Sequence, residues 1–161
     1  MTQSSAHNHD PLRPHSHEPN PQPPSADETF RFFLPDGTET RLNTLDLQAL
    51  PEMTIPNCYI VSTGHGTSGP FTFAGATLLA LIESRVTSDW SEAEVISADG
   101  FGNRVTAAEL HQPDPAGPIL LAYRLDDQPL TRAEGLIRMI VPSEKDDALR
   151  QVKWVGEIRV K

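Results

Sequence analysis

The sequence predicts an α+β fold: a single compact domain with a mixed, mostly antiparallel sheet and short helices. Three observations predict it. Short runs with the β-branched and aromatic composition of strands recur along the chain. Turn dipeptides, Asp36-Gly37 and Asp99-Gly100 among them, separate these runs. The stretches with helical spacing are brief, and no internal repeat is visible.

The first part of the chain reads as a hairpin followed by a short helix. Phe30–Leu34 and Thr38–Leu42 flank the turn signal Pro35-Asp36-Gly37. Thr44–Leu50 carries spaced leucines and ends before a proline, which favours a short helix. A strand is then expected at Asn57–Thr63, a glycine-rich loop at Ser62–Pro70 and an amphipathic helix at Thr77–Arg85.

The second part is richer in strands. Glu94–Ala98 is expected to be a strand that stops at the Asp99-Gly100 turn. Thr106 and Glu109 have capping-box spacing and predict one helical turn. Three C-terminal strands are expected at about 118–124, 136–142 and 151–160.

Length and composition divide the chain into a tail and one domain. A chain of 161 residues suits about one domain. Residues 1–28 are rich in proline, hold four of the six histidines and contain almost no large apolar side chain. Such a segment cannot bury enough surface to offset its ordering entropy. We therefore expect a disordered tail at 1–28 and a folded domain at 29–161.

Charge and cysteine usage exclude several classes of partner. The net charge of −9 argues against nucleic acid and against an anionic membrane surface. A single cysteine, Cys58, rules out an intramolecular disulfide and fits a reducing compartment. No apolar secretory signal or bilayer-length apolar run is visible. The expectation is a soluble, cytoplasmic protein.

Each of the last three predicted strands carries a cation near an end. These are Arg124, Arg138 and Lys153. A strand cation is expected at the rim of a sheet, where it meets an anion or solvent. Either an anionic ligand or an ordinary surface ion pair would satisfy Arg138 and Lys153.

The glycine-rich segment Gly64–Gly69 satisfies the letters G-x-G-x-x-G. A dinucleotide site is not expected, because the extended-looking Pro70–Phe73 follows where a helix should begin. Converging backbone N–H groups could still form an anion-binding nest. A tight surface connection is the ordinary structural alternative.

Several of these motifs resemble the molybdopterin-binding domain of the sulfite oxidase family. The matching segments are Phe73–Leu78, Asp99–Phe101, Ala122–Tyr123, Pro129–Leu130, Gly135–Arg138 with Pro142, and Val152–Trp154. The resemblance covers about residues 36–160. It implies a sulfite oxidase-like fold, a molybdenum–molybdopterin cofactor and oxo-transfer redox chemistry, with a small-molecule substrate or an electron-transfer partner.

The resemblance also implies roles for individual residues. Ser62 falls at the metal-ligand position and is a catalytic candidate together with Asp99. Cofactor contacts would come from Thr63, Gly64, His65, Gly66, Arg138, Gln151, Val152 and Lys153. Phosphate recognition by arginine and backbone N–H groups is the physical basis for the last four.

The chain departs from the family pattern at several positions, and Leu136-Ile137 in place of the usual proline-containing pair is one of them. The family's metal-binding cysteine is replaced by Ser62 or Thr63, and Ala133 stands where some members have a pterin-contacting histidine. Enzyme activity is therefore left open. The alternative function is a non-catalytic domain of the same fold that has lost the metal and serves as a binding module or partner subunit.

Three further motifs allow two interpretations each, and a fourth lacks a required element. Cys58 is either a buried small apolar residue or a displaced metal thiolate. Asp99 is either catalytic or a turn former. A hydrolase triad of Ser62 or Ser68, His65 and Asp99 lacks the expected nucleophile elbow. The tail histidines, at 7, 9, 15 and 17, form either a weak metal-binding segment or a solvated linker.

Overall fold

The computed structural model describes residues 27–62, 66–144 and 150–161. The predicted tail, up to residue 26, lies outside this range. In chain order the elements are β1 (Phe30–Phe33), β2 (Glu39–Leu42), α1 (Thr44–Gln48), β3 (Met53–Ser62), β4 (Gly66–Thr77), α2 (Leu78–Arg85), β5 (Glu92–Ser97), β6 (Gly102–Thr106), α3 (Ala107–His111), β7 (Leu120–Leu125), β8 (Gln128–Pro129), β9 (Arg138–Ile140) and β10 (Val155–Val160).

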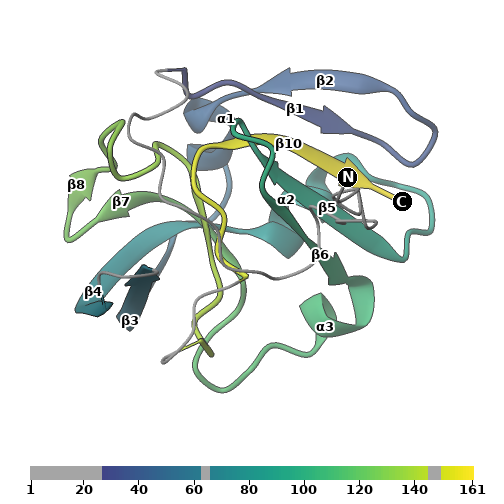
Figure 1. Cartoon of the computed structure of the whole chain (residues 1–161). Coiled ribbons are helices and arrows are strands. Elements are labelled where there is room, and N and C mark those ends of the chain that lie inside the picture. The colour runs from purple at the N-terminus through teal and green to yellow at the C-terminus, as the bar shows by residue number, and fades with distance from the viewer. Residues whose placement is uncertain (1–26, 63–65, 145–149) are drawn as a thin grey trace, which may run out of the picture.

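The predicted α+β class is confirmed, and the strands divide into two sheets (Figure 1). The first sheet has the order β2-β1-β10-β5-β6. Its β1–β10 pair is parallel and its other pairs are antiparallel. The second sheet has the order β3-β4-β7-β8, with β9 also paired to β7, and its pairs are antiparallel. The pairing is therefore mixed and mostly antiparallel, as expected.

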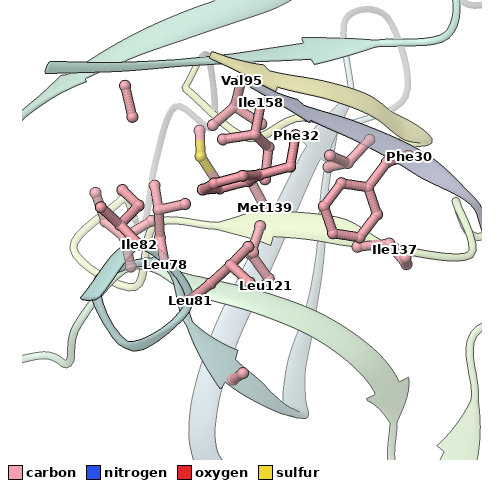
Figure 2. Close-up of a cluster of buried hydrophobic side chains, with 14 of the residues drawn as sticks. Phe30, Phe32, Leu78, Leu81, Ile82, Val95, Leu121, Ile137, Met139 and Ile158 are labelled. Atoms are coloured by element: carbon pink, nitrogen blue, oxygen red, sulfur yellow. The ribbon is translucent and has the colours of Figure 1, made fainter. Parts of the chain in front are cut away.

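The main core lies between the two sheets and includes α2 (Figure 2). Leu78, Leu81 and Ile82 have the spacing of one helix face, and all three are fully buried. The first sheet contributes Phe32 and Ile158. The amphipathic helix predicted at Thr77–Arg85 is thus confirmed, with Thr77 as its N-cap accepting from the Ala80 N–H.

A second apolar cluster covers the other face of the second sheet. Along β7, Leu121 points into the main core while Leu120 and Ala122 belong to this second cluster. It also contains Ile55, Cys58, Phe73, Leu130 and Ile140. Because β7 is buried on both faces, its sequence reads as a continuous apolar run rather than an alternation.

The glycine-rich segment differs from the predicted loop. β4 begins at Gly66 and pairs with Ser62, so Gly66–Pro70 forms a strand of a long β3–β4 hairpin. Gly69 has φ +131°, and a Cβ there would lie 2.8 Å from the Cys58 carbonyl oxygen. The expected strandlike character of residues 70–73 is confirmed. No helix begins directly after the glycines, as a dinucleotide-binding loop would require.

The last predicted strand is shorter than expected. β10 begins at Val155 rather than at residue 151. Ahead of it, Val152 exchanges two backbone hydrogen bonds with Met139, and Trp154 has φ +48°. A left-handed residue breaks the extended geometry of a strand, so the chain turns between Val152 and Val155. This turn carries Lys153.

Candidate anion-binding site

Arg138 is a buried cation at the start of β9. It lies opposite Ala122 in register, and its side chain shares a sheet face with Ile140 and the second apolar cluster. Only 4% of its surface is exposed. Burial lowers the pKa of Arg138 to about 10, an effect that the Glu134 carboxylate partly opposes. Arg138 was expected at the rim of a sheet, where solvent reaches it, but its side chain is largely removed from solvent.

The hydrogen bonding of Arg138 is incomplete. Nη1 donates to the Glu134 carbonyl oxygen at 3.2 Å. Nε has no hydrogen-bond partner among the described residues. A buried guanidinium of this kind is costly unless an anion satisfies it.

The turn before β9 explains why the nearest carboxylate does not pair with Arg138. Glu134 accepts from the Thr131 N–H at 2.9 Å, while the Glu134 N–H bonds back to the Thr131 hydroxyl at 3.2 Å. This reciprocal pair is a capping box. Gly135 and Leu136 follow with φ +112° and +56°. The turn thus occupies the Glu134 carboxylate and directs Arg138 into the sheet.

Lys153 brings a second positive charge to the same region. A Cβ placed on Gly135 would lie 3.3 Å from the Lys153 Cβ, so the two backbones are in close approach. Burial first, and then the charge of Arg138, lower the pKa of Lys153, while Asp99 opposes the shift. Its Nζ lies 5.5 Å from the centroid of the Trp154 ring. Two neighbouring cations, of which Arg138 lowers the pKa of Lys153, define a local positive potential in an acidic protein.

Trp154 and Gln151 hold the Lys153 segment in place. The Trp154 indole N–H donates to the Arg132 carbonyl oxygen at 2.6 Å, and its backbone N–H donates to Gly135 at 3.0 Å. The Gln151 side-chain amide donates to the Tyr59 carbonyl oxygen at 3.0 Å. Its Oε1 is buried and has no partner among the described residues. The Arg138 Nε needs an acceptor and the Gln151 Oε1 needs a donor among groups other than the described residues. A ligand with an anionic group and an N–H donor would supply both.

The remaining predicted site residues are placed differently. The Val152 side chain is fully buried in the main core, and its backbone N–H and C=O bond to Met139. Asp99 forms the β5–β6 turn and accepts from the Phe101 N–H at 3.0 Å, which confirms its turn role. Its catalytic role stays a prediction. The charge of Asp99 acts on Lys153, whose pKa it raises against the effect of burial.

The residues predicted to lie near the metal of the cofactor fall mostly outside the described residues. Thr63, Gly64 and His65 are not among them, and the structure describes Ser62 and Gly66 only as a backbone pair in the hairpin. The proposed contacts of these residues, and the triad with His65, stay predictions. No group of three metal-ligating side chains occurs within the described ranges.

Cys58 is a core residue. It is 1% exposed and belongs to the second apolar cluster. Its Sγ lies 3.6 Å from the Ile55 carbonyl oxygen and 3.8 Å from that of Pro56. The prediction of a buried small residue is confirmed.

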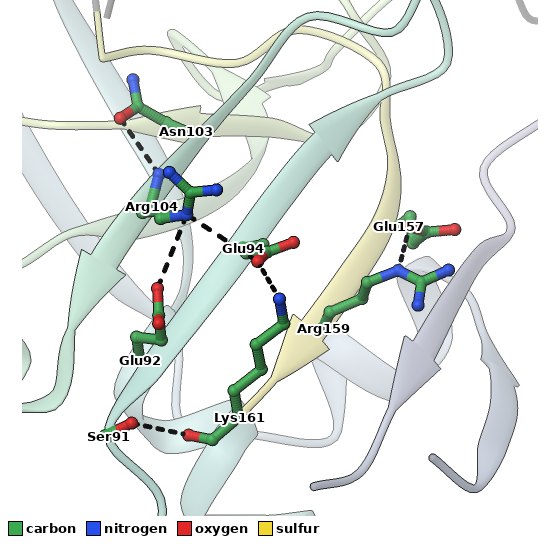
Figure 3. A network of polar contacts seen from close by, with 8 residues as sticks. All are labelled: Ser91, Glu92, Glu94, Asn103, Arg104, Glu157, Arg159 and Lys161. Carbon is green, nitrogen blue, oxygen red and sulfur yellow. Dashed lines mark hydrogen bonds and ion pairs between the residues drawn. The ribbon is translucent and has the colours of Figure 1, made fainter. Parts of the chain in front are cut away.

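Other charged residues of the domain are paired with each other. On the outer face of the first sheet, Glu94 lies between Arg104 and Lys161 (Figure 3). Glu157 pairs with Arg159 and with Arg31. Arg150 makes a two-pronged contact with Glu109. Arg138 differs from these cations because no ion pair to it occurs within the described part of the chain.

Sequence reasoning identified Arg138 and Lys153 but missed the turn that positions them. The signal was present, since Thr131 and Glu134 have the same T-x-x-E spacing as Thr106 and Glu109. No sequence signal indicated the buried Gln151 oxygen. The orientation of the Gln151 side chain depends on its hydrogen bond to Tyr59, which is 92 residues away in sequence.

The two packed sheets carry a buried guanidinium beside a lysine, and this guanidinium has no ion pair among the described residues. They define an α+β domain with a candidate site for an anionic group. The chain belongs to the oxidoreductase molybdopterin binding domain family, whose model matches residues 21–161. This confirms the family resemblance seen in the sequence.

Two relatives illustrate the similarity. Mitochondrial sulfite oxidase of Drosophila melanogaster is 26% identical over 167 residues, which cover 87% of this chain and 28% of that protein. The crystal structure of the sulfane dehydrogenase SoxCD from Paracoccus pantotrophus matches with a TM-score of 0.63 and 18% identity, over 84% of this chain and 38% of that chain. The latter similarity establishes the fold. The chain spans well under half the length of either relative.

Proposed function

We propose that this domain binds a molybdenum–molybdopterin cofactor through its phosphate group, with Arg138 and Lys153 as the main contacts. The unpaired Nε of buried Arg138 is the observation that carries the proposal. An unpaired buried ion costs several kcal/mol by order of magnitude, and a bound phosphate would offset that cost with charge-assisted hydrogen bonds.

The residues present fit the anionic end of this cofactor. The Arg138 guanidinium supplies a planar donor, and the Lys153 ammonium adds charge nearby. Gln151 Oε1 supplies an acceptor that a pterin N–H could use. When bound, the cofactor would supply oxo-transfer redox chemistry to a small substrate, with Ser62 as the proposed ligand at the metal end. We also propose that the protein acts on a small-molecule substrate or with an electron-transfer partner, and that it is located in the cytoplasm.

The second candidate is a binding module or partner subunit without redox activity. The burial of Cys58 in an apolar cluster favours it, because the family's thiolate ligand has no counterpart in an accessible position.

Among the described residues, no helix is long and apolar enough to cross a bilayer.

The test is cofactor retention. The protein would be purified from a host that makes molybdopterin, and the fluorescent oxidised pterin released on denaturation would be measured per chain. We expect near-stoichiometric pterin in the wild type and at least a tenfold loss in an Arg138→Met, Lys153→Gln double variant. Arg41→Ala, which removes an exposed arginine from β2, is the matched control and should retain the pterin. Absence of pterin from the wild type, or full retention by the double variant, would overturn the proposal.

A further inference from the structure

The outer face of the first sheet carries a row of charged side chains. Phe32 and Ile158 are paired in register and point into the main core. The neighbouring pair, Arg31 and Glu157, therefore points outward. Cross-strand register and ion pairs place further members on this surface, which we call the charged face: Arg31, Phe33, Glu94, Arg104, Glu157, Arg159 and Lys161.

Glu157 is a carboxylate that two arginines share. Arg31 donates to one of its oxygens at 2.6 Å, and Arg159 contacts the other oxygen. The Glu157 side chain is 11% exposed, whereas the Arg31 and Arg159 side chains are 48% and 43% exposed. Glu39, on the edge strand β2, lies 3.9 Å from Arg31 and limits the cationic surface on that side. At the centre of the face the anion is thus covered by two cations.

Glu94 repeats this arrangement on the neighbouring strand β5 (Figure 3). Arg104 lies 3.8 Å from its carboxylate, and the Lys161 ammonium also contacts it. The Glu94 side chain is 6% exposed, against 42% and 55% for these two cations. Glu92 lies 3.7 Å from Arg104 at the margin of the face. The groups that the centre of the face presents to solvent are therefore mainly cationic.

Phe33 lies between the two arginines that share Glu157. The guanidinium carbons of Arg159 and Arg31 lie 4.1 and 5.5 Å from the centroid of its ring. The ring contacts and the ion pairs together hold both guanidiniums in place, so less side-chain freedom is lost when they bind a partner. Arginine and aromatic residues are also the types enriched in protein–protein interfaces.

We propose that the charged face is the docking surface for a protein partner whose contact surface is rich in carboxylates. The planar guanidinium of an arginine can hold a carboxylate through two N–H groups. Charge complementarity favours this partner over nucleic acid, because the net charge of −9 repels a long polyanion wherever it extends beyond the face. The inference is independent of the proposed cofactor, since the charged face belongs to the first sheet and Arg138 to the second.

The binding test compares the wild type with a triple variant, Arg31→Gln, Glu157→Gln and Arg159→Gln. This variant removes two cations together with the carboxylate beneath them, so Glu157 is not left as an unpaired buried charge. The control is Arg85→Gln, which lowers the net charge by the same amount and removes an exposed arginine that pairs with Asp46 on another surface. Thermal unfolding checks that both variants are folded.

A fluorescent hexaglutamate peptide serves as the acidic probe. We expect saturable binding to the wild type that weakens as salt is added. Binding to the triple variant should be at least tenfold weaker, and binding to the control should be unchanged. Equal binding by the wild type and the folded triple variant, or no saturable binding to the wild type, would overturn the inference.

A 30-nucleotide single strand distinguishes an acidic protein from nucleic acid. It should bind no more tightly than hexaglutamate, because its additional phosphates would meet the acidic remainder of the domain. Tighter binding of the long strand, lost in the triple variant, would assign the charged face to nucleic acid and contradict the inference.

Arginine side-chain NMR gives a readout that needs no variant. Hexaglutamate should shift the Nε–H resonances of Arg31 and Arg159 most. Those of Arg85 and Arg124, which are 37% and 44% exposed on other surfaces, should stay in place. Equal shifts at all four arginines would show that the probe selects no surface, and the inference would then be wrong.

Discussion

Gln151 donates a hydrogen bond from its side-chain amide to the backbone carbonyl oxygen of Tyr59, at 3.0 Å. This bond joins the segment that carries Lys153 to the β3–β4 hairpin. The two regions proposed to hold the phosphate and the metal end of a cofactor are therefore connected through one side chain.

Replacing Gln151 should weaken the fold and the site together. Gln151→Met keeps the volume but leaves the Tyr59 carbonyl without this donor, which should cost about 1–2 kcal/mol of unfolding free energy. Gln151→Glu should cost more, since its carboxylate would face the carbonyl. Urea unfolding measures both. Equal stability of the three proteins would show that the bond contributes nothing.

Arg138→Met should separate function from stability. Removing an unpaired buried charge while keeping an apolar side chain of similar length should raise the unfolding free energy by roughly 1 kcal/mol or more. Phosphate should raise the melting temperature of the wild type but not of this variant. In the matched variant Arg150→Met, which loses the two-pronged contact with Glu109, stability should fall by about 1–3 kcal/mol. A large loss of stability in Arg138→Met would indicate a structural role instead.

Phosphate binding should weaken at alkaline pH. Burial and the charge of Arg138 lower the pKa of Lys153 below its ordinary 10.5, so this cation loses its proton earlier than an exposed lysine. Titration calorimetry with inorganic phosphate should show affinity falling as pH rises toward that value. In Lys153→Gln the affinity should be lower and should fall less steeply with pH, because only Arg138, whose pKa burial lowers to about 10, still loses a proton in this range. An undiminished pH dependence in this variant would assign the effect to a group other than Lys153.

Tyr123 should make the fold sensitive to strong alkali. Burial and its hydrogen bond to Glu52, at 2.8 Å, raise the pKa of Tyr123 to about 12 from 10.0. The folded state keeps the phenol proton over a range where the unfolded state releases it. The stabilisation is therefore fully present below pH 10.0 and is lost as pH rises through about 12.

The size of this effect can be measured by substitution. Between about pH 8 and about pH 11, the wild type should lose roughly 1 kcal/mol more stability than Tyr123→Phe, which has no phenol to ionise. Urea unfolding at the two pH values gives the comparison. Parallel losses in the two proteins would place the alkaline sensitivity elsewhere.

Gly75 should tolerate no side chain. A Cβ at this position would lie 2.0 Å from the Leu121 carbonyl oxygen, a backbone atom of the neighbouring strand. Gly75→Ala should therefore force β4 and β7 apart and cost more than about 3 kcal/mol, or prevent folding. Gly156→Ala, whose Cβ would lie 3.3 Å from the Ala98 nitrogen, is the control and should cost about 1 kcal/mol or less. Similar unfolding midpoints for the two variants would contradict this explanation.

Local chemistry made much of this fold predictable from sequence. The β1–β2 hairpin follows from its Asp-Gly turn, and α2 follows from the spacing of its leucines after the Thr77 cap. These features depend on residues that are near one another in the chain.

The candidate site was only partly predictable. The sequence by itself placed Arg138 near the end of a strand and showed that Cys58 is the single cysteine. Only the tertiary structure decided that Arg138 is buried beside Lys153, that the Thr131 turn occupies the Glu134 carboxylate, and that Cys58 faces an apolar cluster. Burial and charge pairing depend on which distant strands become neighbours, and a local pattern of residue types does not encode that arrangement.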